Sequence, residues 1–316
     1  MRPLSLTLLA GAATAIASSA SVCPEDNSHA TGDALQAILD YKNSDHEIMA
    51  AYFRSWRDVA SDPKVNKVSF EDLPDCLDIA FVFSEGDEPA AFYTALKDKY
   101  VPTLHSRGTK LVRTVGIQQL LNKNYTNDEE GYESLAKHLL ETLVDAHGLD
   151  GLDVDVEASL NADQLKQAAG VFKALSKSLG PKSNTGKILI YDTNQNGDTA
   201  LFKQVHSYVS YALVQSYGRS LSGLQRTFDT YKPYISANQY LFGFSFYEER
   251  GAHWGDTNAP INTSRAYSYA KWEPKGTKKG GIFSYATDRD GVPDGQDAIV
   301  PTDFSWTREL ISVMNP

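Results

Sequence analysis

Leu149-Asp150-Gly151-Leu152-Asp153-Val154-Asp155-Val156-Glu157 alternates acidic and apolar residues over most of its length. Side chains along a β-strand point alternately to opposite faces, so Asp153, Asp155 and Glu157 share one face and the apolar residues share the other. In a barrel of parallel strands, the apolar face would pack on outer helices and the acidic face would point inward. The last acid would then stand at the carboxyl end of the strand, where barrel enzymes keep their active sites.

The rest of the chain supplies the partners that such a strand needs. Eight apolar or β-branched runs are separated mostly by helical patterns: Met49–Trp56, Leu77–Ser84, Lys110–Ile117, Leu149–Glu157, Lys187–Asn194, Tyr208–Tyr217, Tyr240–Glu248 and Gly280–Asp288. Strands that alternate with helices indicate βα units and a parallel sheet. We therefore predict an α/β protein with a single-domain (β/α)8 TIM barrel, and a doubly wound open sheet is the alternative.

The connecting helices are visible as apolar stripes. The pattern after the fourth run repeats at three- and four-residue steps from Leu165 to Leu179, with Asn161 as a predicted N-cap and Gly180-Pro181 as its end. A second stripe runs from Tyr132 to Leu143, and Thr199–His206 leaves room for one short helix.

Composition excludes several classes of protein. The chain has 316 residues, a hydrophobic fraction of 41% and a formal net charge of −10, which argues against nucleic-acid binding. No apolar run reaches the length of a membrane span. Two cysteines exclude a cysteine zinc cluster, the histidines lack metal-ligand spacing, and we expect no cofactor and no metal.

The N-terminus has the features of a secretory signal. Arg2 precedes an apolar run from Leu4 to Ala15, followed by small residues, so we expect residues 1–20 to be removed by cleavage between positions 17 and 22. Residues 21–316 would then form the secreted, extracellular catalytic domain. In that compartment Cys23 and Cys76 are expected to pair, with two separate buried thiols as the alternative. The sequons at Asn124 and Asn262 are compatible with secretion.

The acidic face of the fourth run carries the chemistry. Neighbouring carboxylates that are poorly solvated cannot all ionise near neutral pH, so the cluster should retain a proton and could act as a general acid. A polar strand end or a divalent-metal site is the alternative. An EF-hand is excluded because Ala158 and Gln164 occupy the positions that require Gly and Glu.

Asp150-Gly151-x-Asp153-x-Asp155-x-Glu157 resembles the DGxDxDxE signature of glycoside hydrolase family 18. Most of the mature chain is similar to the F-type and S-type endo-β-N-acetylglucosaminidases of that family. Five further stretches carry this resemblance: Tyr52–Asp58, His105–Arg113, Tyr191–Asn194, Gln215–Gly218 and Tyr285–Gly291. These enzymes cleave between the two N-acetylglucosamines at the root of an Asn-linked glycan.

The resemblance implies a role for each catalytic residue. Glu157 would be the general acid and later the base, in a family that uses the substrate's own acetamide as nucleophile. Asp155 would accept the acetamide N–H, and Asp153 would share its proton with Asp155. Gln215 and Tyr217, which share a strand face, would hydrogen-bond the acetamide and the oxazolinium intermediate.

Two departures favour the glycan-core branch over a chitinase, which remains the alternative. Family 18 chitinases usually carry Ser-x-Gly-Gly on the third strand, where this chain has Thr114-Val115-Gly116-Ile117. They also carry a Trp on the eighth strand, where this chain has Tyr285. A silent carbohydrate-binding barrel is a third reading, which the presence of Glu157 disfavours.

The predicted substrate contacts lie near the strand ends. We expect Trp56, Asn194, Tyr285 and Asp288 to bind sugar, since exposed aromatic rings stack on sugar rings. We interpret the acidic stretch 288–297 as a polar loop, and a calcium site is the alternative. The expected partners are N-glycans on glycoproteins, with a weak preference for biantennary complex glycans. We expect no nucleic acid, no membrane and a monomer.

Overall fold

A computed structural model describes residues 23–24, 28–293 and 295–316. The predicted signal peptide, residues 1–20, lies outside the described residues. Eight strands form a closed barrel in the order in which they occur along the chain. The strands are β1 Ile48–Arg54, β2 Ile79–Phe83, β3 Lys110–Gly116, β4 Gly151–Asp155, β5 Ile188–Thr193, β6 Tyr211–Gln215, β7 Tyr240–Ser245 and β8 Gly281–Tyr285.

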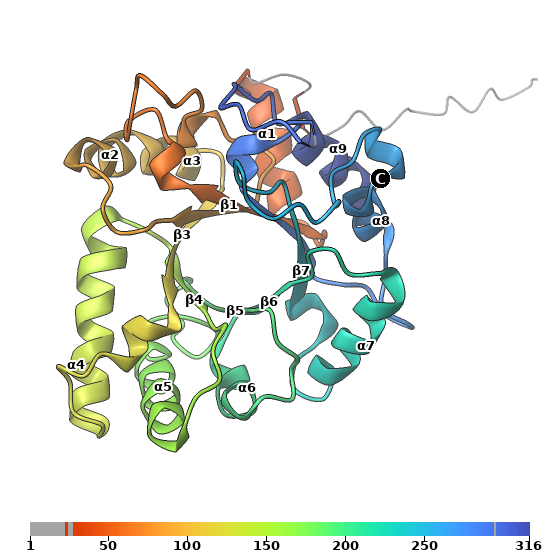
Figure 1. Cartoon of the computed structure of the whole chain (residues 1–316). Coiled ribbons are helices and arrows are strands. Elements are labelled where there is room, and N and C mark those ends of the chain that lie inside the picture. Colours follow the sequence, from red (N-terminus) through yellow and green to blue (C-terminus); the bar gives the residue numbers. More distant parts are fainter. Residues whose placement is uncertain (1–22, 25–27, 294) are drawn as a thin grey trace, which may run out of the picture.

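Every pair of neighbouring strands is parallel, including the pair β1 and β8 that closes the ring (Figure 1). The predicted TIM barrel is therefore confirmed, and the open sheet is wrong. Seven of the eight strands fall within the predicted runs, and β1 begins one residue before its run, at Ile48. Most runs extend a few residues beyond the strands into the loops.

Helices surround the barrel (Figure 1). The α-helices are α1 Gly32–Lys42, α2 Ala90–Ala95, α3 Val101–His105, α4 Glu129–Leu139, α5 Ala162–Leu175, α6 Ala200–Val205, α7 Leu221–Tyr231, α8 Arg265–Lys271 and α9 Ser305–Met314. Only 3-10 turns connect β1 to β2. Helix α1 lies outside β1 and beside α9. Asn315, directly after α9, donates a 3.0 Å hydrogen bond to the hydroxyl of Tyr41 in α1.

Local signals set the helix boundaries. Asn161 and Gln164 form a reciprocal capping box at the start of α5, as the sequence predicts. Thr199 caps α6 by accepting a hydrogen bond from the backbone of Phe202. Helix α5 ends at Leu175, earlier than the apolar stripe suggests, because the stripe continues through turns to Leu179.

The barrel has two apolar cores. One lies inside the ring, and its fully or nearly fully buried members are Ala50, Tyr52, Ile79, Phe81, Val112, Ile188, Ile190, Leu213, Leu241 and Phe283. The larger core lies between strands and helices and contains the opposite face of each strand. Burial on both faces explains why the strands read as continuous apolar runs. The few acids on the inner face are therefore exceptions that need a reason.

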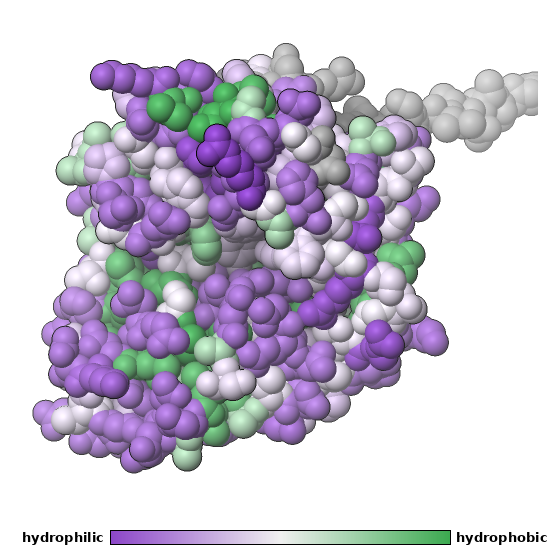
Figure 2. All heavy atoms as spheres, in the orientation of Figure 1, coloured by the Kyte–Doolittle hydropathy of each residue, from purple (hydrophilic) through white to green (hydrophobic). Residues whose placement is uncertain are grey.

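Cys23 and Cys76 form a disulfide with Cα atoms 5.3 Å apart. The pairing is as expected, and the alternative of separate thiols is wrong. Asn124 and Asn262 of the two sequons are exposed. Within the described part of the chain, no helix is both long and apolar enough to cross a membrane. The face shown in Figure 2 is largely hydrophilic and is hollowed at its centre, where Figure 1 places the ring of strands.

Candidate active site

The three acids of β4 form a row that leads from the barrel interior to its mouth. Asp153 is fully buried, Asp155 is half-buried and Glu157, just beyond the strand, is exposed. In the strand register Asp153 pairs with Thr114 on one side and Ile190 on the other, which places it within the inner core. The predicted inward face is confirmed.

The first two residues of the motif have structural roles. Gly151 starts β4 where a Cβ atom would lie 2.1 Å from the carbonyl oxygen of Ile188, so only glycine fits there. Asp150 points away from the interior. Its Oδ2 accepts from the backbone N–H of Leu111 at 2.8 Å and lies 2.7 Å from Nε2 of His105.

Asp153 is held by neutral donors. Its Oδ2 accepts hydrogen bonds from the hydroxyls of Tyr52 at 2.9 Å and Thr114 at 3.0 Å, while its buried Oδ1 has no protein partner. Burial and the nearby charge of Asp155 raise the pKa of Asp153 well above its ordinary value. A protonated Asp153 is the form that this environment favours.

Asp155 is contacted by an amide. Its Oδ1 accepts a 3.2 Å hydrogen bond from Nε2 of Gln215. Burial, followed by the charge of Glu157, raises the pKa of Asp155 to about 7, although the bond from Gln215 opposes this shift. Asp155 therefore titrates in the range where a proton can be exchanged with a neighbour or a substrate.

Asp192 of β5 is a fourth carboxylate that the sequence analysis did not assign. It lies beside Asp155 in the register and is 3% exposed. The same Nε2 of Gln215 donates to its Oδ2 at 3.0 Å, so Gln215 bridges Asp155 and Asp192. Burial and the charges of Asp155 and Asp153 raise the pKa of Asp192 well above its ordinary value. The signal that could have found it is its alternation with Ile190 and Ile188 on an inward strand face.

Glu157 stands at the mouth. Its Oε2 accepts a 3.1 Å hydrogen bond from the side-chain amide of Asn194. Asn194 comes directly after β5 and holds the carboxylate from one side, and its predicted contact with sugar stays a prediction. The remaining exposure of Glu157 leaves it accessible to a ligand above the barrel.

Aromatic rings line the opposite side of the mouth. Tyr217 packs on Tyr285 with ring centroids 6.2 Å apart, and on Trp254 at 6.1 Å. The Tyr217 hydroxyl donates no hydrogen bond within the described residues, and burial raises its pKa well above the usual value. It is therefore a neutral donor that remains available to a ligand. Trp254 is 46% exposed, which fits a ring that covers the mouth.

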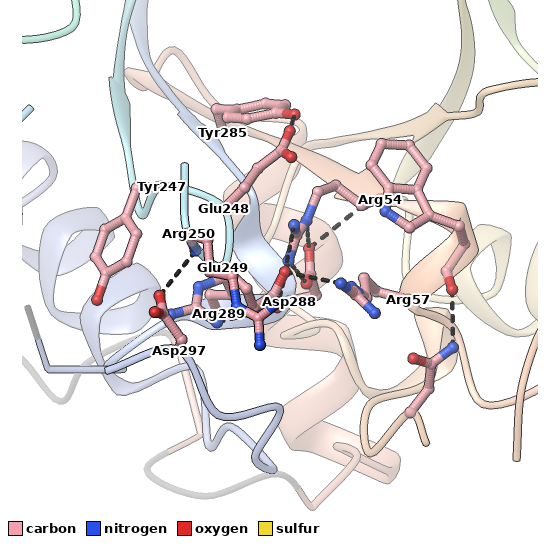
Figure 3. Close-up of polar contacts among 12 residues, drawn as sticks. Arg54, Arg57, Tyr247, Glu248, Glu249, Arg250, Tyr285, Asp288, Arg289 and Asp297 are labelled. Carbon is pink, nitrogen blue, oxygen red and sulfur yellow. Dashed lines mark hydrogen bonds and ion pairs between the residues drawn. The ribbon is translucent and has the colours of Figure 1, made fainter. Parts of the chain in front are cut away.

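A network of ion pairs supports the mouth at β1, β7 and β8 (Figure 3). Arg54 is fully buried, and its guanidinium contacts Asp288 at 2.6 Å and Glu249 at 3.0 Å. Arg57 and Arg289 also contact Glu249, at 3.0 and 2.9 Å. Burial would raise the pKa of Glu249, but its bonds with Arg54 and the charge of Arg54 lower it to about 2.

This network changes the interpretation of two predicted sugar contacts. Asp288 is 5% exposed and is engaged by Arg54, so a sugar contact through its carboxylate would require a buried ion pair to break. We assign it a supporting position instead. Tyr285, at the end of β8, donates a short hydrogen bond to Glu248 and stays at the mouth (Figure 3).

Trp56 is half-buried beyond β1, 5.7 Å from the ring of Phe83, and its contact with sugar stays a prediction. Two other acids of stretch 288–297 face different groups. Asp290 caps the backbone of α9 at Trp306 and Thr307, and Asp297 accepts from the backbone of Arg250. Among the described residues, no group of three or more potential ligands could hold a metal ion.

The site therefore combines an accessible acid, buried neutral carboxyl groups and free neutral donors, all at the carboxyl end of the barrel. Comparison with known proteins gives this arrangement a family. Residues 51–284 match the endo-β-N-acetylglucosaminidase EndoS TIM-barrel domain. The chain belongs to this family. The resemblance to family 18 endo-β-N-acetylglucosaminidases is confirmed, and the chain is a glycoside hydrolase.

Relatives of the EndoS-type family cover most of the chain. Endo-β-N-acetylglucosaminidase F2 of Elizabethkingia meningoseptica is 44% identical over 289 residues, which are 89% of this chain and 86% of that protein. EndoS of Streptococcus pyogenes serotype M1 is 35% identical and aligns with 84% of this chain, but with only 33% of its own length.

A crystal structure of endo-β-N-acetylglucosaminidase from Cordyceps militaris has a TM-score of 0.92 at 64% identity, covering 94% of this chain and all of that one. A variant of that enzyme was crystallised with fucosyl-N-acetylglucosamine-Asn. In it, an aspartate and a glutamate two positions apart are replaced by their amides. Asp155 and Glu157 have the same spacing here.

Proposed function

We propose that the chain hydrolyses the β1,4 bond between the two N-acetylglucosamines of the chitobiose core of Asn-linked glycans, with retention and by substrate assistance. The observation that carries this proposal is the row from Asp153 to Glu157, with an exposed acid at its end and, behind it, two carboxyl groups whose pKa values are raised by burial. The EndoS-type relatives support the substrate class.

Glu157 protonates the glycosidic oxygen as the bond to the leaving sugar breaks. The carbonyl oxygen of the neighbouring 2-acetamido group attacks the anomeric carbon from the opposite face, forming an oxazolinium ion. Glu157 then takes a proton from water, which opens the ring, so two inversions give net retention. No carboxylate of the protein bonds to the sugar in this sequence of steps.

Asp155 assists because its pKa lies near neutrality. In its ionised form it accepts the acetamide N–H and stabilises the positive charge that develops on the ring. Asp153 and Asp192, whose pKa values are raised, remain protonated beside it. A preorganised group of this kind contributes about 10²–10³-fold in rate.

Gln215 and Tyr217 orient the acetamide. Nε2 of Gln215 donates hydrogen bonds to Asp155 and Asp192, which fixes the orientation of the side chain. Its carbonyl oxygen can then accept a hydrogen bond from a ligand. The Tyr217 hydroxyl supplies a neutral donor for the acetamide oxygen. Both residues are positioned by β6 and its first turn, where alternate side chains point inward.

The ligand of a related enzyme supports cleavage at the glycan root. The Cordyceps militaris relative holds fucosyl-N-acetylglucosamine-Asn, which is what cleavage of a core-fucosylated glycan would leave behind. We therefore include core-fucosylated N-glycans among the substrates of this chain. Biantennary complex glycans remain the preferred class in this proposal.

The test uses the purified chain with a defined glycopeptide, with and without core fucose, and with chitin oligosaccharides. Release of the intact glycan, leaving one N-acetylglucosamine on Asn, is the expected result in both glycopeptide arms. Cleavage of chitin alone would support a chitinase. Binding to both substrates without cleavage would support the silent barrel.

Secretion is part of the same proposal. It is supported by the signal-like pattern of residues 1–20 and by the disulfide between Cys23 and Cys76, which suits an oxidising compartment. Expression of the full chain should release a protein that begins between positions 18 and 23. A cell-retained protein beginning at Met1 would contradict this.

A further inference from the structure

An open groove of about 730 Å³ lies on the outer side of the barrel, away from its interior. Its lining comes from β3 and from the helical segments that follow β2 and precede β4, and includes Tyr93, Lys97, Asp98 and Arg113, with Thr142 and His147 opposite. Arg113 points outward, because its neighbour Thr114 faces inward and binds Asp153.

Arg113 is unlike the other buried arginines. It is 7% exposed, yet within the described part of the chain it has no hydrogen bond and no ion pair, and its buried Nε has no partner. Arg54, Arg107 and Arg289, by contrast, are each paired with a carboxylate, and Arg308 donates to the backbone carbonyl of Asp303. Burial of an unpaired charge is costly, so a partner for this guanidinium is expected.

Two further basic groups line the same groove without a polar partner in the described residues. Lys97 is exposed, and the ring of His147 stacks on Tyr93 with centroids 5.2 Å apart. Burial and the charges of Arg113 and Lys97 lower the pKa of His147. The carboxylate that lines the groove is the exposed Asp98. The groove is therefore an electropositive surface with an aromatic wall.

The backbone of both walls is unusual. Leu96–Tyr100, which carries Lys97 and Asp98, is π-helical, and so is Leu140–Val144, which carries Thr142 and Leu143. A π-helical turn is rare and is often found at functional sites. Two such turns face each other across one groove.

We propose that this groove binds an oxyanion, a carboxylate, phosphate or sulfate group of a larger ligand, which Arg113 holds at the base with Lys97 and His147 beside it. The planar guanidinium can donate two parallel hydrogen bonds to such a group. The paired rings of Tyr93 and His147 offer a flat surface to whatever carries the anion. The proposal does not rest on the glycosidase activity.

The test is histidine NMR on the purified full chain. It follows His147 during addition of inorganic phosphate, of a sialic-acid-containing trisaccharide, and of neutral lactose as a control. A bound oxyanion favours the charged imidazolium, so the pKa of His147 should rise with saturating dependence on the anion. Lactose should leave it unchanged. The two oxyanion arms distinguish a phosphate-type ligand from a sugar carboxylate.

Variants separate binding from nonspecific charge. Lys97→Ala should weaken the response about 2- to 5-fold and Arg113→Met at least about tenfold. Lys203→Ala, an exposed lysine on α6, should not change it. Because Lys97 is exposed, its variant keeps the test valid even where loss of Arg113 disturbs folding. Absence of a response to both oxyanions, or an equal response in Lys97→Ala and wild type, would overturn the proposal.

Discussion

Two groups of carboxylates stand at the same end of the barrel and have opposite surroundings. Asp153, Asp155 and Asp192 are contacted by hydroxyls and one amide, and no described cation bonds to them. Glu249 and Asp288, at β7 and β8, are contacted by arginine guanidinium groups. The members of both groups are buried or half-buried.

Between these two groups, the arginine partners of Glu249 and the absence of a cation beside Asp155 account for pKa shifts in opposite directions. Where arginines are present, the pKa of Glu249 falls to about 2 and the acid is a structural anion. Where they are absent, burial raises the pKa of Asp155 to about 7 and raises the pKa values of Asp153 and Asp192 well above their ordinary values. The barrel thus keeps protons at the catalytic strand and fixed charges at the supporting rim.

The largest expected effect comes from removing the accessible acid. Glu157→Gln keeps the size of the side chain but supplies no proton, so glycopeptide cleavage should fall about 10²–10⁴-fold. Its circular dichroism and unfolding midpoint should match wild type. Near-normal cleavage by a folded Glu157→Gln variant would refute the assignment of the general acid.

The next effect separates the acetamide partner from the acid. Asp155→Asn should lower cleavage of the natural glycopeptide about 10²–10³-fold, because its amide cannot stabilise the developing charge. Transfer from a preformed sugar oxazoline should be affected much less. Equal losses with both donors would mean that Asp155 does not act on the acetamide.

Weakening the ion-pair network of Arg54, Glu249 and Asp288 should lower the stability of the fold. Glu249→Gln leaves Arg54 without one of its anions, so the free energy of unfolding should fall by about 3–5 kcal/mol at pH 7. Because the folded-state pKa of Glu249 is lowered to about 2, its contribution in wild type is present above its ordinary value of 4.5 and lost as pH falls through about 2.

The measurement is urea unfolding of both proteins at pH 7 and at the lowest pH where both still fold. The difference between them should narrow toward acid. A difference that stays constant with pH would show that the charge of Glu249 is not what stabilises the rim.

Asp192→Asn should change stability in the opposite direction and by less. The raised folded-state pKa of Asp192 means that its stabilising effect is full below its ordinary value of 3.8 and lost as pH rises through the folded-state value. An amide loses nothing over that range, so the variant should gain about 0.5–2 kcal/mol at pH 8. Its cleavage rate should fall, since Gln215 is anchored on this carboxyl group.

Unfolding at pH 4.5 and at pH 8 checks the sign. The variant should be close to wild type at the lower pH and more stable at the higher one. If Asp192→Asn proved less stable than wild type at pH 8, Asp192 would be an ionised, stabilising group like Glu249.

The sequence predicts what depends on local periodicity. The alternation from Leu152 to Glu157 placed the acids inside, and the capping box at Asn161 placed the start of α5. The alternation of Asp192 with Ile188 and Ile190 indicates an inward-facing position, but not its role, which depends on the pairing of β5 with β4 and β6. Contacts between different strands leave no signal within one strand.

The same reason applies to the ion pair of Asp288, which the sequence did not predict. Its partner Arg54 lies 234 positions earlier in the chain, and only closure of the barrel between β1 and β8 brings the two together. Likewise, the sequence shows Arg113 as a single basic residue on a strand. The groove around it forms from helical segments of two separate βα units, so it could not be predicted from the strand alone.

We infer that the carboxyl groups at β4 and β5 retain protons at neutral pH because no cation pairs with them. Infrared difference spectroscopy of the folded protein at pH 7 measures this directly, through the C=O stretch of protonated carboxyl groups. We predict that this band is present in wild type, smaller in Asp153→Asn and in Asp192→Asn, and unchanged in Glu249→Gln. A wild-type spectrum without a protonated carboxyl band at pH 7, or a band that only Glu249→Gln removes, would contradict the account.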